Sequence, residues 1–169
     1  MKNVLRMKPG EEVWVSDGEG MDYFCSVEGY EEKEAVLRVV KKEVSQTELA
    51  SRLILFQGLP KGDKMEWIVQ KAVELGAYSI VPFAAKRSVV KLEKRERWQA
   101  IAKGAAEQSK RGIVPQVQDV MSFQEAMNYA KELDVVLVPY ELQEGMKATE
   151  AVISKIEPGQ SVGIFIGPE

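Results

Sequence analysis

The chain has 169 residues, 45% of them hydrophobic and 29% charged, with a formal net charge of −3. This length and composition predict one globular α/β domain with a small additional module. The sequence contains a single cysteine, Cys25, and no histidine. It therefore cannot form an intrachain disulfide, a multi-cysteine metal site or a His-dependent catalytic triad. No apolar run reaches the roughly 18 residues of a membrane span, and no cleavable leader is visible, so we expect a cytoplasmic protein.

The net charge hides an uneven distribution along the chain. Residues 1–51 carry 7 Lys and Arg against 11 Asp and Glu, and residues 112–169 carry 3 against 9. Between them, residues 52–111 carry 13 against 6. A basic middle between acidic ends predicts a local site for a polyanion. For any single lysine, a solvated helix face is the simpler interpretation.

The start of the chain predicts a β-rich module. Pro9-Gly10 forms a turn before an alternating segment at residues 11–15, and a second turn at residues 17–20 precedes an extended segment at residues 23–27. A third extended segment spans residues 35–40. Three short strands do not make a stable barrel by themselves. We therefore expect a module over residues 1–47 that leans on the rest of the chain or lacks a strand.

Apolar strands and amphipathic helices alternate in the remainder, residues 52–169. The predicted strands are residues 53–56, 78–82, 135–138 and 162–166. The predicted helices are one starting at Asp63, one over residues 91–111, one starting at Ser122, and a fourth ended by residues 157–159. Asp63 with Glu66, and Ser122 with Glu125, have the spacing of capping boxes. This alternation predicts a mostly parallel sheet with helices on both faces, and the apolar run at 135–138 predicts a strand buried on both faces.

Ligands of such sheets bind beyond the carboxyl ends of the strands. The segments at those ends are residues 57–58, 83–88, 139–141 and 167–169. No G-x-G-x-x-G or Walker A pattern follows a strand, which argues against a standard dinucleotide or P-loop site. The last strand runs directly into Gly167-Pro168-Glu169, where bare backbone allows a ligand to approach closely.

Four stretches of the sequence, in order along almost the whole chain, resemble one known family. They are Asn3-Val4-Leu5-Arg6-Met7-Lys8-Pro9-Gly10-Glu11, Lys71-Ala72-Val73-Glu74-Leu75-Gly76, Ala106-Glu107-Gln108-Ser109-Lys110-Arg111 with Pro115, and Ile166-Gly167-Pro168-Glu169. The chain resembles the RsmE-type RNA methyltransferases of the SPOUT superfamily, which methylate N3 of a uridine in small-subunit (16S) ribosomal RNA. The resemblance implies a PUA-like β-barrel, a trefoil-knotted α/β domain, S-adenosylmethionine as methyl donor, and a homodimer.

The chain departs from the family pattern at both ends. Family members usually begin with a further segment before Val4, and they continue past Glu169 through a second glycine and the loops that tie the knot. We therefore expect a chain truncated at both ends, with an incomplete barrel and without the C-terminal knot.

The resemblance and the strand-end argument together give the candidate site residues. For the donor they are Gly167, Pro168, Glu169, Tyr140 and Glu141. For RNA they are Arg6, Lys8, Lys64, Arg87 and Arg111. For catalysis they are Arg111, which would stabilise the anion formed at the uridine, and Glu107, which would accept its proton.

Three alternatives to this interpretation stay open. Glu107 and Arg111 have the spacing of an exposed i, i+4 ion pair on a helix. The whole chain would also suit a non-catalytic RNA-binding module, or a Rossmann-like enzyme that acts on a small molecule.

Overall fold

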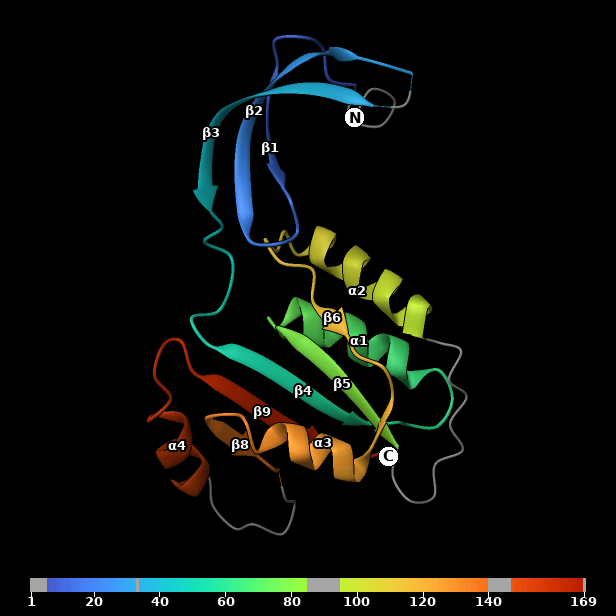
Figure 1. Cartoon of the computed structure of the whole chain (residues 1–169), viewed down its shortest axis with the longest axis vertical. Coiled ribbons are helices and arrows are strands. Elements are labelled where there is room, and N and C mark those ends of the chain that lie inside the picture. The colour runs from blue at the N-terminus through green and yellow to red at the C-terminus, as the bar shows by residue number, and fades with distance from the viewer. Residues whose placement is uncertain (1–5, 33, 85–94, 140–146, 169) are drawn as a thin grey trace. The chain divides into compact units, whose positions relative to one another are not determined.

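The computed structural model of the protein describes residues 6–32, 34–84, 95–139 and 147–168. It divides into two compact units, one formed by residues 1–48 and 110–113 and the other by residues 49–109 and 114–169. Each unit contains its own β-sheet (Figure 1). Among the described residues, none of the helices combines the length and apolar character needed to cross a bilayer.

The first unit is built on an antiparallel sheet in the order β1-β2-β3. Its strands are β1 (Glu12–Ser16), β2 (Met21–Tyr30) and β3 (Ala35–Val44). This confirms the three predicted strands, and β3 continues four residues beyond its predicted end. Gly18 and Gly20 adopt positive φ angles of 78° and 107° in the turn between β1 and β2, a conformation that glycine takes without steric penalty.

The second unit contains a parallel sheet in the order β6-β5-β4-β9-β8, with β7 paired to β5. Its strands are β4 (Arg52–Gly58), β5 (Ser79–Ala84), β6 (Gln116–Val117), β7 (Met121–Ser122), β8 (Val135–Leu137) and β9 (Ser161–Ile166). Every pairing in this sheet is parallel. The predicted mostly parallel α/β sheet is therefore confirmed.

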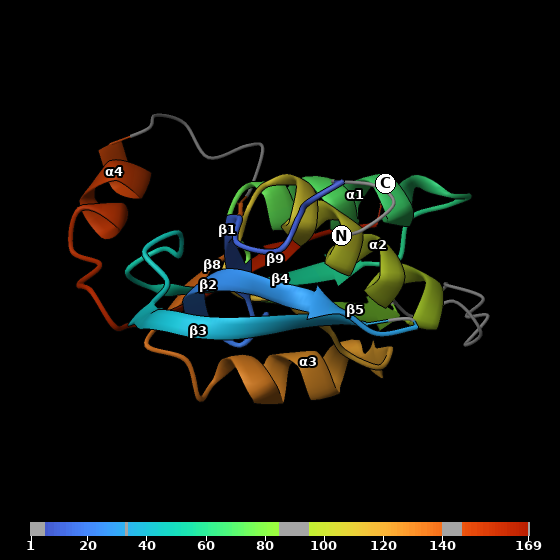
Figure 2. The same cartoon turned by 90° about the horizontal axis from the view of Figure 1, so that it is seen from above.

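Helices cover both faces of this sheet (Figure 2). The described helices of this unit are α1 (Lys64–Glu74), α2 (Arg95–Gln108), α3 (Phe123–Ala130) and α4 (Lys147–Ile153), of which α1, α2 and α3 pack on the sheet. On one face, α1 and α2 bury Val69, Val73 and Trp98 with Ile80 of β5. On the other face, α3 packs on a second cluster that includes Phe56 and Phe165. Since side chains alternate along a strand, successive residues of β4 contribute to the two clusters in turn.

Three predictions about helix ends need correction. The N-cap of α1 is Asp63, but its backbone has ψ near 11° and its side chain makes no capping hydrogen bond; the predicted capping box is wrong because an N-cap normally needs an extended backbone. Ser122 has that geometry, with ψ 157°, and forms the predicted box with Glu125. The second helix ends at Gln108 rather than Arg111, since Lys110 lies in the left-handed region with φ 56°. The fourth ends at Ile153, before the predicted stop.

The prediction that residues 135–138 form a strand buried on both faces is also wrong. In the described sheet β8 pairs with β9 and lies at the end of the strand order. Val136 is 40% exposed and Val138 is 67% exposed. A continuous apolar run is typical of a central parallel strand, but apolar content alone does not distinguish a central strand from an edge strand.

Candidate functional site

The carboxyl ends of β5, β4 and β9 meet at one edge of the second unit's sheet. In the parallel registers, Gly58 of β4 is paired with Phe83 of β5, and Gln57 of β4 is paired with Ile166 of β9. Gly167 and Pro168 follow β9 at this edge and are exposed. In parallel α/β sheets this edge is where ligands bind, so we call it the strand-end edge.

A buried amide holds the backbone at the strand-end edge. Gln57 is only 3% exposed. Its Nε2 donates hydrogen bonds to the carbonyl oxygen of Gly58 at 2.8 Å and to that of Gly167 at 3.3 Å. A Cβ atom at Gly58 would lie 2.6 Å from Cδ of Pro168 and 2.7 Å from its nitrogen. The Gly167-Pro168 turn therefore approaches β4 so closely that only glycine fits at position 58.

Aromatic rings support the same edge from the α3 face. The rings of Phe56 and Phe165 stack with centroids 4.4 Å apart and an angle of 3° between their planes. Phe83, which precedes the last residue of β5, has its ring centroid 5.8 Å from that of Phe165. Packing of this kind holds the ends of three strands in fixed relative positions.

The predicted donor-binding residues are only partly described by the structure. Gly167 and Pro168 lie together at the strand-end edge, as expected from their place after the last strand. Glu169, Tyr140 and Glu141 lie outside the described residues, and so does Arg87 of the predicted RNA-binding set. The sequence predicts Gln57 and Gly58 just beyond a strand end and indicates no role for them, whereas they are the last two residues of β4. The available signal was a polar residue followed by glycine at the end of an apolar strand.

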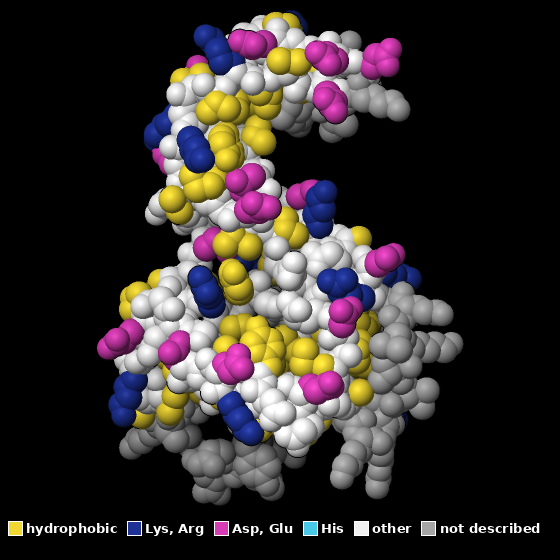
Figure 3. Space-filling model, in the orientation of Figure 1, with side chains coloured by type: hydrophobic (Ala, Val, Ile, Leu, Met, Phe, Trp, Pro, Cys, Tyr) yellow, Lys and Arg dark blue, Asp and Glu magenta, His cyan; other side chains and the backbone are white. Residues whose placement is uncertain are grey.

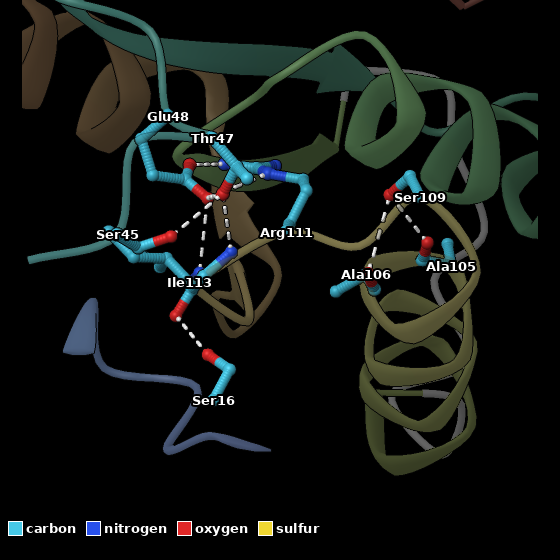
Figure 4. A network of polar contacts seen from close by, with 10 residues as sticks. Ser16, Ser45, Thr47, Glu48, Ala105, Ala106, Ser109, Arg111 and Ile113 are labelled. Atoms are coloured by element: carbon cyan, nitrogen blue, oxygen red, sulfur yellow. Dashed lines mark hydrogen bonds and ion pairs between the residues drawn. The ribbon is translucent and has the colours of Figure 1, made fainter. Parts of the chain in front are cut away.

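Arg111 is buried in the first unit and paired with Glu48 (Figure 4). Its Nε lies 3.4 Å from Oε1 of Glu48, and its terminal NH2 group contacts Oε2. Glu48 also accepts a hydrogen bond from the backbone N–H of Ile113 at 3.1 Å. Next to this pair, Oγ1 of Thr47 accepts from the backbone N–H of Gly112 at 2.8 Å. Residues 110–113 are thereby fastened to residues 45–48.

Glu107 and Arg111 do not form an exposed pair on one helix. Glu107 is exposed in the last turn of α2, whereas Arg111 is 8% exposed and lies beyond the end of that helix. The i, i+4 alternative is wrong because the chain leaves the helical path at Lys110. Glu107 belongs to the second unit and Arg111 to the first.

The described residues predicted to contact RNA are all exposed except Arg111. Arg6 and Lys8 lie in the first unit, and Lys64 is the first residue of α1, shortly after the carboxyl end of β4. On the face of the second unit visible in Figure 3, basic and acidic side chains are interspersed. Among the described residues, no group of three or more His, Cys, Asp or Glu side chains is placed to hold a metal ion.

Comparison with known families identifies both parts of the chain. Residues 47–169 match the model of an RNA methyltransferase domain, and residues 1–40 match that of an RNA methyltransferase PUA domain. The ribosomal RNA small subunit methyltransferase E of Bacillus subtilis is 40% identical over 176 residues, which cover 99% of this chain and 69% of that protein.

Solved structures show the same fold. The ribosomal RNA small subunit methyltransferase E of Neisseria gonorrhoeae, bound to S-adenosylmethionine, has a TM-score of 0.79 and 27% identity. A putative methyltransferase of Legionella pneumophila, in complex with the same cofactor, has a TM-score of 0.76 and 26% identity. Each match covers 99% of this chain and 69% of the other. These findings confirm the expected α/β fold of the SPOUT class with a PUA-related N-terminal region. The chain belongs to the RNA methyltransferase family that includes the ribosomal RNA small subunit methyltransferases E.

Proposed function

We propose that the protein transfers a methyl group from S-adenosylmethionine to N3 of a uridine in small-subunit (16S) ribosomal RNA. The observation that carries this proposal is the RNA methyltransferase match over residues 47–169, a segment whose strand-end edge presents the Gly167-Pro168 backbone. The Neisseria gonorrhoeae relative, whose structure contains the donor, supports the choice of cofactor.

Gly167 and Pro168 at the strand-end edge suit a ligand that binds to backbone groups of the protein. Gly167 has no side chain and is exposed, and Pro168 follows it. The bound donor would supply a methyl group on a sulfonium sulfur. The nucleophile attacks the methyl carbon in line and displaces the sulfur. The protein has to align this donor with the uridine and exclude water, because positioning supplies most of the rate in such a displacement. Tyr140, Glu141 and Glu169 complete the proposed donor site.

The uridine must lose its N3 proton, and the negative charge that develops on N3 and O4 needs a cationic partner. The candidates for these roles are Glu107 as the acceptor of the proton and, separately, Arg111 or Arg87 as the cation. A preorganised cation of this kind is worth about 10²–10³ in rate. In this structure the guanidinium of Arg111 is paired with Glu48, so a contact with the uridine would have to share this cation with the carboxylate or displace it.

Two substitutions separate catalysis from anchoring at Arg111. If Arg111 stabilises the uridine anion, Arg111→Ala lowers the single-turnover rate of methyl transfer more than it lowers RNA affinity. Arg111→Lys retains the charge but not the planar fork, so it restores RNA binding better than rate. Parallel losses of rate and affinity would leave Arg111 as an anchor, and full activity of Arg111→Ala would contradict any role in the reaction.

The proposed partners follow from the same assignment. Arg6, Lys8, Lys64 and Arg87 would contact RNA phosphates, which position the substrate without reading its sequence. We also propose that the protein acts in the cytoplasm and forms a homodimer. Val136 on β8, Val138 just after it and Leu75 after α1 are exposed apolar residues, and they support a subunit contact. Light scattering of the whole natural protein measures its mass and tests the dimer.

The function is tested by incubating the whole natural protein with labelled S-adenosylmethionine and unmethylated small subunits, then identifying the modified nucleoside by mass spectrometry. The proposal predicts 3-methyluridine in the small-subunit RNA and none in large-subunit RNA. Binding of RNA without methyl transfer would favour a non-catalytic RNA-binding module. Methylation at another atom or in another RNA would refute the assigned specificity.

A further inference from the structure

The side-chain amide of Gln57 is not needed for the pairing of β4 with β9. The ladder between β4 and β9 already runs from Arg52 to Gln57, and the stacked rings of Phe56 and Phe165 fasten the two strands near their ends. The hydrogen bond from Gln57 Nε2 to the carbonyl of Gly167 acts one residue beyond this ladder. It therefore fixes the turn that follows the strand, rather than the strand itself.

Burying a primary amide is unfavourable unless its polar atoms find partners. The Nε2 group of Gln57 donates hydrogen bonds to two carbonyl oxygens, those of Gly58 and Gly167. This arrangement fixes the peptide group between Gly167 and Pro168 from one side. The missing side chain of Gly58 lets Pro168 approach from the other side. Two consecutive residues of β4 thus determine the position of an exposed two-residue turn.

We propose that Gln57 is a positioning residue for the methyl donor, and that it holds the Gly167-Pro168 backbone in the conformation that receives S-adenosylmethionine. The inference rests on the proposed function, because it takes this turn as part of the donor site. A turn that recognises a ligand through its backbone cannot adapt through side-chain rotamers. Its affinity consequently depends on how well the backbone is fixed before the ligand arrives.

Two substitutions at Gln57 test this role in the whole natural protein. Gln57→Met keeps the length of the side chain and removes both hydrogen bonds. It should weaken S-adenosylmethionine binding in calorimetry by about tenfold, in line with the loss of one or two such bonds, and raise the KM for the donor without a matching change in RNA affinity. Gln70→Met is the matched control, since Gln70 is an exposed glutamine of α1 whose Nε2 donates to Oε1 of Glu74 on the same helix.

Gln57→Glu provides a readout that a merely steric role would not change. The carboxylate has no N–H and faces two carbonyl oxygens, so donor affinity should fall further than in Gln57→Met at about pH 8. A protonated carboxyl group regains one donor, and burial raises the pKa of a carboxyl group. Affinity of Gln57→Glu should therefore recover relative to wild type as the pH is lowered to about 6. Gly58→Ala, which forces Pro168 away, should reproduce the loss without this pH dependence.

The outcomes separate this inference from the proposed function. If the wild-type protein binds no S-adenosylmethionine, the proposed function fails and the inference fails with it. If wild type binds the donor and a folded Gln57→Met binds it equally well, only the positioning role is overturned. A loss of binding that matches a loss of folded protein in thermal unfolding, with no pH-dependent recovery in Gln57→Glu, would also overturn it, since it would reduce Gln57 to a structural residue.

Discussion

Arg111 and Glu48 form the most deeply buried ion pair among the described residues, with side-chain exposures of 5% and 18%. A buried charge is stabilised only while its partner and its hydrogen bonds remain. Here the carboxylate of Glu48 also accepts from the amide of Ile113, so one side chain organises both the arginine and the backbone after it. At the scale of single residues, this pair joins two segments that are distant in the sequence.

We expect Arg111→Ala to lower the free energy of unfolding by about 3 kcal/mol, because it removes a guanidinium that is only 5% exposed, together with its ion pair to the partly buried Glu48. Replacing both partners, in Glu48→Gln with Arg111→Met, should be less harmful than the sum of the single changes. Arg97→Ala is the control. Arg97 pairs with Glu66, and its side chain is 64% exposed. Arg97→Ala should therefore lower the free energy of unfolding by less than about 1 kcal/mol. Urea unfolding measures these variants together with the single variants Glu48→Gln and Arg111→Met, and equal losses for Arg97→Ala and Arg111→Ala would contradict this account.

The hydrogen bonds between Asp134 and Ser161 make a contribution to stability that depends on pH. The hydroxyl and the amide of Ser161, at the start of β9, donate to Oδ2 of Asp134 at 2.6 Å and 2.7 Å. The side-chain hydrogen bond, followed by the backbone one, lowers the pKa of Asp134 below its usual value. A lowered pKa in the folded state means that this carboxylate contributes stability above the usual aspartate pKa, and that the contribution is lost as the pH falls through the lowered value.

Ser161→Ala should therefore raise the pKa of Asp134 toward its usual value. The stability difference between wild type and Ser161→Ala should be largest near neutral pH and should shrink as the pH falls to about 3. Chemical unfolding at several pH values measures this difference. Ser154→Ala, at an exposed serine near the end of α4, is the control. A difference between wild type and Ser161→Ala that stays constant with pH would show that Asp134 is not its source.

At the scale of elements, two glycines differ sharply in what surrounds them. A Cβ atom at Gly112 would lie 2.2 Å from Oγ and 2.3 Å from Cβ of Ser45. At Gly104, within α2, no atom of the described residues lies within 4 Å of such a position apart from its chain neighbours and the backbone of its own helix. The first glycine permits the close contact between residues 110–113 and residues 45–48, whereas the second only weakens a helix.

Gly112→Ala and Gly104→Ala should consequently change stability in opposite directions. Gly112→Ala must displace Ser45, so it should lower the free energy of unfolding by about 1–3 kcal/mol, as substitutions that overpack a site do. Gly104→Ala should gain about 0.5–1 kcal/mol from helix propensity. Thermal unfolding of both variants measures the two effects, and a neutral Gly112→Ala would mean that these segments are not in close contact.

Elements with a strong local signal could be predicted from the sequence, and those set by distant partners could not. Ser122 and Glu125 form their capping box because its geometry depends on four consecutive residues. The exposure of Val136 could not be predicted, because it depends on which strand lies beside β8. The burial of Arg111 depends on Glu48, 63 residues earlier in the chain, and no periodicity links these two positions. The role of Gln57 could not be predicted for the same reason, since its partner Gly167 lies 110 residues away.

At the scale of the whole molecule, the uneven charge predicts salt-dependent RNA binding. Affinity should fall linearly on a log–log plot against salt, because phosphate contacts release counterions. Replacing Lys64 and Arg87 by Ala should reduce the slope by about one unit for each lost phosphate contact. Lys131→Ala, an exposed lysine in the acidic last third of the chain, is the matched control. An unchanged slope for Lys64 and Arg87 would mean that they are only solvated surface charges.

We propose that the methyl donor binds at the carboxyl ends of β5, β4 and β9, against the Gly167-Pro168 turn that Gln57 holds. A crystal structure of the whole natural protein with S-adenosylmethionine tests it most directly. We expect the donor to contact the Gly167-Pro168 backbone, with the hydrogen bond from Gln57 to the carbonyl of Gly167 still in place. A donor bound away from this turn, or a turn whose carbonyl has left Gln57, would contradict the account.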